Sequence, residues 1–250
     1  MHQEERLLAI FTYLKENQKM SIHDICHRLQ VSRDTARRDI LKLLEQGIVA
    51  RTYGGISLPI LKNSIKEYRE RLHEGSQEKE HLSEKAYSFI QPNGHYFFDV
   101  STTVRFLAQK IDKTIWVTTH SLDNLEILAE NKNVHVNITG GELQKKNRFF
   151  YYPGCSAYIA SMHFDIAFIG TATLDKNGLY YTDSEDAFVK HEAIKYADSV
   201  IVLAEAEKFN ATSYHKAAGW EDIDILITTK DPPLEMKRIF ASHHVQTIVV

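Results

Sequence analysis

The sequence predicts a two-domain α/β chain, in which a small helical domain precedes a larger domain built on a mostly parallel, doubly wound sheet. Within the first 58 residues, three amphipathic helical patterns are followed by two short extended runs around a glycine pair. From residue 95 onward, short β-branched runs alternate with helical stretches, which is typical of a parallel sheet with helices on both faces. A chain of 250 residues is long enough for both domains.

The first two helices are predicted from apolar spacing. Residues 4–17 place Leu7, Ile10, Phe11 and Leu14 on one face. Residues 21–29 repeat the pattern with Ile22, Ile25 and Leu29. Ser21 begins this helix with Asp24 three residues on, which is close to a capping box.

A third helix is predicted to begin at Ser32, whose hydroxyl can cap it, and to end at Gly47. Only Gln30, Val31 and Ser32 separate it from the second helix, a turn of helix-turn-helix length. Its apolar stripe contains Ala36, Ile40, Leu43 and Leu44.

The opposite face of this helix is basic and polar. Arg and Lys side chains suit a major groove, where arginine reads guanine and phosphate contacts fix the register. The following run, R-T-Y-G-G at 51–55, predicts a wing. A solvated amphipathic helix is the alternative, but three helices and a wing in under 60 residues favour DNA binding. The predicted DNA-binding residues are Ser21, Ser32, Arg33, Thr35, Arg37, Arg38, Lys42, Arg51 and Tyr53.

These motifs closely resemble the DNA-binding domain of DeoR-type bacterial transcriptional regulators. The resemblance rests on Arg6, Ile10 and Leu14, on Ser32, on T-A-R-R-D-I at 35–40 and on the 51–55 wing. It implies double-stranded operator DNA as a partner.

Charge and composition agree with DNA contact at one end of a cytoplasmic protein. Residues 31–62 contain six Lys/Arg against three Asp/Glu, although the whole chain has a net charge of −3. Cys26 and Cys155 lie far apart, so neither a disulfide nor a zinc site is indicated. The N-terminus lacks the apolar segment of a signal peptide, and no run is long enough to span a membrane. We expect no metal, cofactor or catalytic residue.

The predicted domains are 1–58 and 77–250, joined by a linker at 59–76. In the second domain we expect helices at 77–90, 101–111, 121–131, 184–196 and 233–241. We expect strands at 95–100, 115–119, 134–139, 164–169, 199–204, 223–228 and 245–250.

Small hydroxyl and glycine residues follow several of these strands. D-V-S-T-T at 99–103, T-T-H-S at 118–121, Gly140-Gly141 and Gly170-Thr171 all lie at predicted strand ends. Ligands of doubly wound sheets bind beyond the carboxyl ends of the strands, at helix N-termini. Each loop alone could be an ordinary helix cap, but four converging loops favour a ligand site.

The same segments, with F-D-I-A-F-I-G at 164–170, resemble the effector domain of the DeoR family, which is similar in fold to ribose-5-phosphate isomerase and glucosamine-6-phosphate deaminase. The resemblance implies a phosphorylated sugar that weakens operator binding. It extends to 178–185, to Lys190 and to 205–209. Ser101, His120 and Glu205 depart from the usual family residues. The predicted effector-binding residues are Asp99, Ser101, Thr102, Thr103, Thr119, Gly141, Gly170, Glu185 and Lys208.

Some readings stay open in the sequence. Lys208 could bind an anionic ligand or pair with Glu205 or Glu207. Arg148 lies in a loop that could cover the pocket, although a solvated basic loop is favoured. The function predicted is a repressor of a carbohydrate-utilisation operon, acting as a homodimer or homotetramer because paired heads read paired half-sites. The alternatives are a sugar-phosphate isomerase or deaminase with a DNA-binding head, and a ligand-independent architectural protein. An enzyme would need a positioned acid/base pair, and the sequence offers only Asp99 and Glu205 as carboxylates near strand ends.

Overall fold

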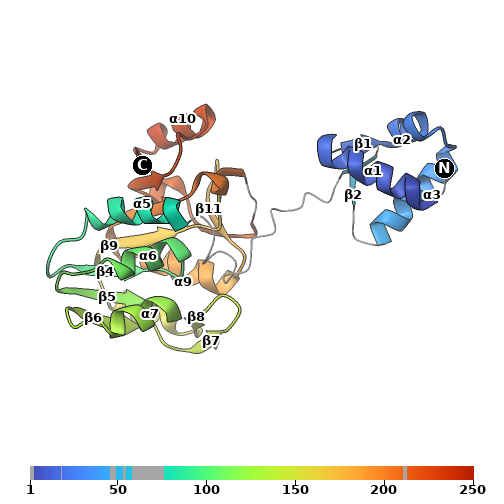
Figure 1. The fold of residues 1–250 in the computed structure, drawn as a ribbon. Helices are drawn as coiled ribbons and strands as arrows, with labels where there is room; N and C mark the ends of the chain where they lie inside the picture. Colours follow the sequence, from blue (N-terminus) through green and yellow to red (C-terminus); the bar gives the residue numbers. More distant parts are fainter. Residues whose placement is uncertain (1–2, 18, 46–48, 53–54, 58–75, 211–212) are drawn as a thin grey trace. The chain divides into compact units, whose positions relative to one another are not determined.

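A computed structural model describes residues 3–17, 19–45, 49–52, 55–57, 76–210 and 213–250. The chain divides into two compact units, Met1–Ser64 and Ile65–Val250, and each is described by itself (Figure 1). The predicted linker at 59–76 lies outside the described residues except for Ser76. The predicted domain boundaries therefore stay predictions.

In its described residues, the N-terminal unit has three helices and a small antiparallel sheet in the order β1-β3-β2. Its elements are α1 (Gln3–Asn17), β1 (Lys19–Ser21), α2 (Ile22–Leu29), α3 (Arg33–Glu45), β2 (Ala50–Thr52) and β3 (Gly55–Ser57). The three helices and the β2–β3 wing are those expected from the sequence. β1 was not expected, because a three-residue strand carries no periodicity of its own.

The apolar stripes of the three helices meet in one core. Ile10, Leu14, Ile25, Ala36 and Leu43 are all at most 1% exposed. The capping box of α2 is complete: Asp24 N donates to Ser21 Oγ, and Ser21 N donates to the Asp24 carboxylate. At the start of α3, Thr35 N donates to Ser32 Oγ, as predicted for a cap. Gly47, predicted to end α3, lies outside the described residues.

The second unit alternates strands and helices. Its helices are α5 (Ser76–Tyr87), α6 (Thr102–Gln109), α7 (Leu122–Ala129), α8 (Cys155–Ala160), α9 (Ser184–Lys195), α10 (Leu234–Ser242) and the short 3₁₀ turns Ala206–Asn210 and Trp220–Asp222. The main strands are β4 (His95–Phe98), β5 (Ile115–Thr119), β6 (Val134–Ile138), β9 (Phe164–Gly170), β12 (Ala197–Ala204), β14 (Ile225–Thr228) and β15 (Gln246–Val249).

These seven strands form a parallel sheet in the order β15-β14-β12-β9-β4-β5-β6, which confirms the predicted fold class. From β4 the chain adds β5 and β6 on one side, and it then returns to add β9, β12, β14 and β15 on the other. The direction of winding reverses between β4 and β9. In open α/β sheets this reversal is where a crevice forms beyond the carboxyl ends of the strands.

Both faces of the sheet are covered, which explains the nearly continuous apolar runs in its strands. Helices α5 and α6 cover one face (Figure 1), and Leu82, Val104 and Leu107 belong to the core on that face. Val189 of α9 and Phe240 of α10 belong to the core on the other face.

Two smaller sheets were not expected from the sequence. β7 (Glu142–Gln144) and β8 (Phe149–Tyr151) form an antiparallel hairpin, and β10 (Thr173–Asp175), β11 (Gly178–Tyr181) and β13 (His215–Ala218) form a three-stranded sheet. Each strand has three or four residues, too few for a period to be read. No helix in the described part of the chain is long and apolar enough to cross a membrane.

Candidate functional site

The outward side of α3 carries the predicted DNA-reading residues. Arg33, Arg37 and Arg38 are exposed and Thr35 is half-buried. Arg37 lies 4.0 Å from Asp34, an exposed pair that contributes little to stability and leaves the guanidinium able to reorient. Three arginines on one exposed helix side form a cationic surface suited to phosphates and guanine edges.

Three other predicted DNA contacts are engaged within the domain. Lys42 Nζ donates to Gln3 Oε1 at 3.2 Å, and the hydroxyls of Ser21 and Ser32 serve as helix caps. The Arg51 side chain and Tyr53 lie outside the described part of the chain. The roles of all five in DNA binding stay predictions.

A buried ion pair fixes α3 against α1. Asp39 is fully buried, and Arg6 Nε lies 2.7 Å from its Oδ2. Gln3 Nε2 and Arg6 Nη2 each donate to Oδ1 at 3.1 Å. The hydrogen bonds from Arg6 to Asp39 raise the pKa of the guanidinium. This contact fixes α3, and with it the exposed arginines, against α1.

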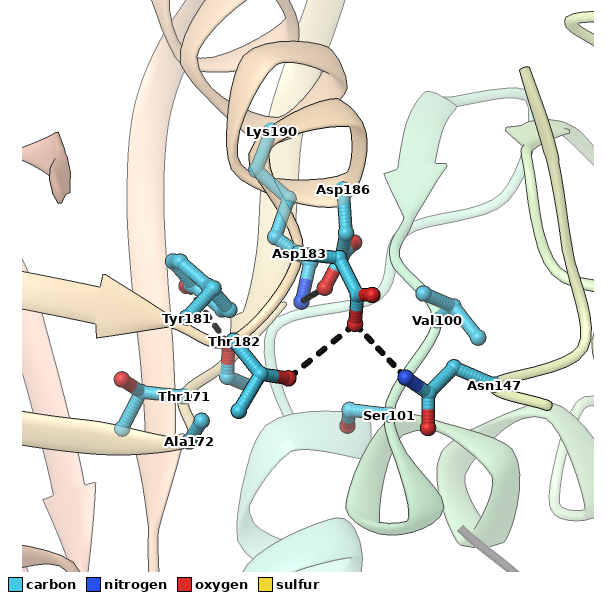
Figure 2. A pocket seen from close by; sticks show the side chains of 11 residues that line it. Val100, Ser101, Asn147, Thr171, Ala172, Tyr181, Thr182, Asp183, Asp186 and Lys190 are labelled. Atoms are coloured by element: carbon cyan, nitrogen blue, oxygen red, sulfur yellow. Dashed lines mark hydrogen bonds and ion pairs between the residues drawn. The ribbon is translucent and has the colours of Figure 1, made fainter. Parts of the chain in front are cut away.

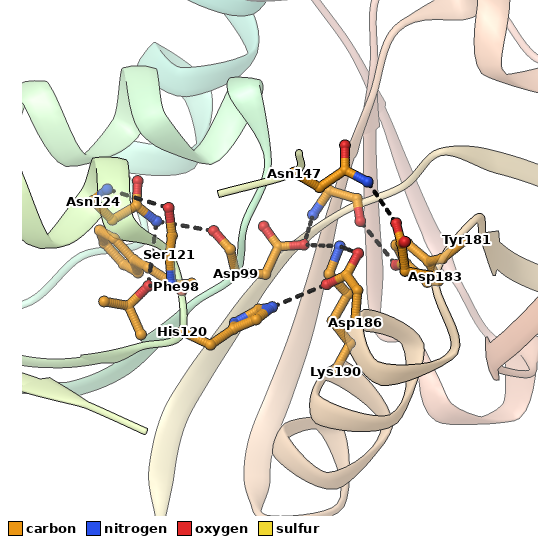
Figure 3. Close-up of polar contacts among 12 residues, drawn as sticks. Phe98, Asp99, His120, Ser121, Asn124, Asn147, Tyr181, Asp183, Asp186 and Lys190 are labelled. Atoms are coloured by element: carbon orange, nitrogen blue, oxygen red, sulfur yellow. Dashed lines mark hydrogen bonds and ion pairs between the residues drawn. The ribbon is translucent and has the colours of Figure 1, made fainter. Parts of the chain in front are cut away.

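In the second unit, a buried charged cluster lies where the winding of the sheet reverses. Asp99 follows β4, and its Oδ2 accepts from Gly170 N at the end of β9 at 2.9 Å. Lys190 Nζ of α9 lies 2.9 Å from Asp99 Oδ2 and 3.1 Å from Asp186 Oδ2 (Figure 3). Asp186 Oδ1 lies 2.9 Å from His120 Nε2. Residues from four separate segments therefore meet at one point.

Burial and charge act in opposite directions on the carboxylates of this cluster. Burial raises the pKa of Asp99 above its ordinary value, and the neighbouring Lys190 offsets this only in part. For Asp186 burial also acts to raise the pKa, but Lys190 and His120 outweigh it, so the pKa is lowered. Tyr181, whose hydroxyl donates to Gly170 O at 2.8 Å, has a strongly raised pKa because it is buried beside these carboxylates.

A small polar cavity of about 20 Å³ opens beside this cluster (Figure 2). Two predicted effector-binding residues, Ser101 and Gly170, line it, and Asp99 lies directly behind Gly170. A Cβ on Gly170 would lie 2.3 Å from Ser101 Oγ, so glycine allows the two strand ends to approach. The remaining lining residues are Val100, Asn147, Thr171, Ala172, Tyr181, Thr182, Asp183, Asp186 and Lys190.

Thr103 belongs to a second buried polar group, at the end of β12. Its Oγ1 donates to Glu205 Oε1 at 3.2 Å. Lys79 of α5, 4% exposed, places Nζ 3.8 Å from the same oxygen. Thr102 is buried in the first turn of α6, whose start is capped by Ser101 Oγ accepting from Val104 N.

The other predicted effector residues do not line the cavity. Thr119 Oγ1 donates to Phe98 O at 2.6 Å and accepts from Ser121 N, so it braces the β5–α7 turn. Gly141 has φ +101° at the start of the β7–β8 hairpin. Glu185 is half-exposed and accepts from Ser184 Oγ, and Lys208 lies 3.2 Å from Glu207, one of the partners considered from the sequence.

The sequence reasoning missed Asp186, Asn147 and Asp183 as site residues, and named Lys190 only within a segment that resembles the family. Asp186 and Lys190 are four residues apart on one helix, so the sequence shows that their side chains lie on the same face, but it does not show that this face is buried. Asn147 gave no signal because it lies in a hairpin that the sequence did not predict. In the described residues, no group of three or more His, Cys, Asp or Glu could hold a metal ion.

Comparison with known proteins agrees with both units. Residues 6–60 match the DeoR-like helix-turn-helix domain and residues 74–230 match the DeoR C terminal sensor domain. The HTH-type transcriptional repressor GlcR of Bacillus subtilis is 37% identical over 233 residues, covering 93% of this chain and 90% of that protein. The L-fucose operon activator of Haemophilus influenzae is 25% identical, covering 96% and 97%.

Two further matches are more distant. The glycerol-3-phosphate regulon repressor of Escherichia coli is 23% identical, with 98% of both chains covered. Among solved structures, ribose 5-phosphate isomerase A from Neisseria gonorrhoeae has a TM-score of 0.37 and 13% identity, covering 54% of this chain and 53% of that one. The two matched domains and the extent of the similarity to GlcR show that the chain belongs to the DeoR family of transcriptional regulators.

Proposed function

We propose that this protein represses a carbohydrate-utilisation operon and is released from its operator by a phosphorylated sugar. The observation that carries the proposal is the convergence of Ser101, Gly170, Asp186 and Lys190 at the reversal point of a domain attached to a DNA-binding head. Of the three relatives described above, two are named repressors, one of them of a glycerol-3-phosphate regulon, and one is named an activator. Repression is favoured because the relative with 37% identity is a repressor.

In this proposal the phosphate binds at the start of α6. The amides of its first turn and the Thr102 and Thr103 hydroxyls follow β4 directly, and helix N-termini favour anions. Lys79 supplies a positive charge beside Thr103. The carbohydrate part would extend toward the cavity bounded by Ser101 and Gly170.

Release would follow from a population shift. A ligand that binds one conformation of the sensor domain better than another shifts the equilibrium by that difference in affinity. A homo-oligomer then loses operator affinity when the spacing of its two DNA-binding domains no longer matches the spacing of the two half-sites.

The alternative is a sugar-phosphate isomerase or deaminase with a DNA-binding head. The contacts of the carboxylates nearest the cavity favour a regulator over an enzyme. Asp99 accepts from Gly170, and Asp186 is paired with Lys190 and His120. A general base must instead be directed at a proton of the substrate.

The test is fluorescence anisotropy on DNA from upstream of the protein's own gene, titrated with hexose and pentose phosphates. Tight, salt-sensitive binding that one compound reverses is the expected result. Replacing both Thr102 and Thr103 with alanine should leave DNA affinity intact and blunt the release. Turnover of any compound in the panel would favour the enzyme instead.

A further inference from the structure

Asp183 occupies the N-cap position of α9 but does not cap the helix. Its backbone is extended, as at an N-cap, yet its carboxylate makes no capping bond. Instead, Oδ2 accepts from Asn147 Nδ2 at 2.6 Å and from Thr182 Oγ1 at 3.0 Å (Figure 2). N-cap side chains normally accept a hydrogen bond from an amide of the first turn. The Asp183 carboxylate is instead directed to the cavity, away from its own helix.

Asn147 reaches Asp183 from the tip of the β7–β8 hairpin. The hairpin is anchored on the opposite side of the cavity, where Phe150 N donates to His120 O at 2.8 Å. Arg148, with φ +57°, places Nε 2.7 Å from Asp123 Oδ1 of α7. The Asn147–Asp183 hydrogen bond thus joins the anchored hairpin to α9 across the cavity.

The cavity beneath this bond is too small for a sugar. It measures about 20 Å³, whereas small-molecule sites usually span roughly 300–1,000 Å³. A ligand can enter only if a lining group moves. Asn147 lies at the tip of a hairpin that is hydrogen-bonded to His120 and Asp123 outside the cavity lining, so loss of its hydrogen bond with Asp183 would open the site with those anchors in place.

The charges around the cavity select which part of a ligand fits. Asp183 and Asp186 line it together with Lys190, whose Nζ already lies between Asp99 and Asp186. A phosphate here would face two carboxylates, and like charges repel. A sugar hydroxyl, by contrast, can donate to a carboxylate, as the Asn147 amide does.

We propose that Asp183 determines specificity by accepting a hydroxyl of the sugar effector, and that the Asn147 amide occupies this acceptor while the site is closed. The inference rests on the proposed function for the identity of the effector. Binding of the hydroxyl displaces Asn147 and frees the tip of the hairpin from the start of α9, while Tyr151 of β8 keeps its ring contact with Phe188 of α9. This couples ligand recognition to a change at the mouth of the site.

The first test needs no ligand. Hydrogen exchange of the segment 144–151 is compared between Asn147→Ala and the wild type, with Asn177→Ala as the matched control. Asn177 is an exposed asparagine in the β10–β11 turn, outside the cavity lining. We expect exchange in Asn147→Ala to rise by about ten-fold or more, the equivalent of one hydrogen bond to a charged carboxylate. Equal exchange in the two variants would overturn the closing role of Asn147.

The second test uses calorimetry with glucose 6-phosphate, fructose 6-phosphate, fructose 1-phosphate, glucosamine 6-phosphate, ribose 5-phosphate and inorganic phosphate. Asn147→Ala should bind the best sugar phosphate about ten-fold more tightly, because the ligand no longer competes with the amide for the Asp183 carboxylate. Asp183→Asn should bind it about ten-fold or more weakly, since hydrogen bonds to charged groups are stronger, and inorganic phosphate should be unaffected. Asp175→Asn, an exposed aspartate of the β10–β11 turn, should match the wild type.

The outcomes separate the two proposals. If the wild type binds a sugar phosphate and Asp183→Asn binds it equally well, the acceptor role of Asp183 is wrong and the proposed function stands. If the wild type and Asn147→Ala bind none of the five sugar phosphates while DNA affinity is intact, the effector class is wrong and the acceptor role falls with it.

Discussion

Lys190 and Asp99 form a buried ion pair, with Nζ 2.9 Å from Oδ2 and side-chain exposures of 2% and 0%. The two residues come from α9 and from the end of β4, which lie 91 positions apart in the sequence. Tyr181 packs beside the pair, its ring centroid 3.9 Å from Nζ. The pair therefore connects α9, which borders the cavity, to the segment between β4 and α6.

Replacing Lys190 with methionine should strongly destabilise the sensor domain. The substitution keeps most of the volume but leaves Asp99 and Asp186 buried without their cation, and loss of one partner of a buried pair costs about 3–5 kcal/mol. Urea unfolding followed by circular dichroism measures the loss. The double variant Lys190→Met with Asp99→Asn should recover part of it, and a double variant no more stable than the single one would contradict the pairing.

Stability should depend on pH through Asp186. Its folded pKa lies below the ordinary value of 3.8, because Lys190 and His120 outweigh the effect of burial. Its ion pairs therefore add stability that is complete above this value and is lost as pH falls through the folded pKa. The difference in unfolding free energy between wild type and Asp186→Asn should be largest near neutral pH and should shrink in acid.

Asp99→Asn is the control for this pH dependence, because burial raises the pKa of Asp99, whereas the pKa of Asp186 is lowered. A raised pKa favours the folded state at low pH and opposes it as pH rises through the folded value. The difference between wild type and Asp99→Asn should therefore change with pH in the opposite direction. Urea titrations at several pH values between 3 and 7 test both signs, and two differences that move together would refute this account.

The main sheet could be predicted from the sequence because its central strands are buried on both faces. Runs such as 115–119 and 164–170 are apolar and β-branched, and the structure places β5 and β9 there. The β7–β8 hairpin and the β10-β11-β13 sheet could not be predicted, since their pairing depends on tertiary contacts rather than on local periodicity.

The candidate site was predictable only where strand ends define it. Asp99, Ser101 and Gly170 follow strands, and the parallel topology brings them together. Thr119 follows a strand as well, but its hydroxyl satisfies the backbone of its own turn. Asp183 and Asn147 meet across 36 positions of sequence, and no local pattern links them.

Ser21→Ala should lower the stability of the DNA-binding domain. We expect any loss of operator affinity to follow from this and not from a lost contact with DNA. The Ser21 hydroxyl accepts from Asp24 N in the capping box, and loss of an N-cap typically costs about 1 kcal/mol. Ser21→Thr keeps the capping oxygen and should be close to wild type in thermal unfolding. If Ser21→Ala loses operator affinity without any loss of stability, the residue contacts DNA as the sequence predicted.

Arg38→Ala should weaken operator binding without unfolding the domain, because Arg38 is exposed on α3 outside the core of that unit. A contact with a base should cost about 1–3 kcal/mol and relax the preference at one position, whereas a phosphate contact should weaken all sequences alike and reduce the salt dependence. Anisotropy at several salt concentrations, on operator and scrambled DNA, separates the two cases. Lys176→Ala, an exposed lysine of the sensor domain, is the matched control and should leave affinity unchanged. If Arg38→Ala binds as tightly as this control, the outward side of α3 does not enter the groove.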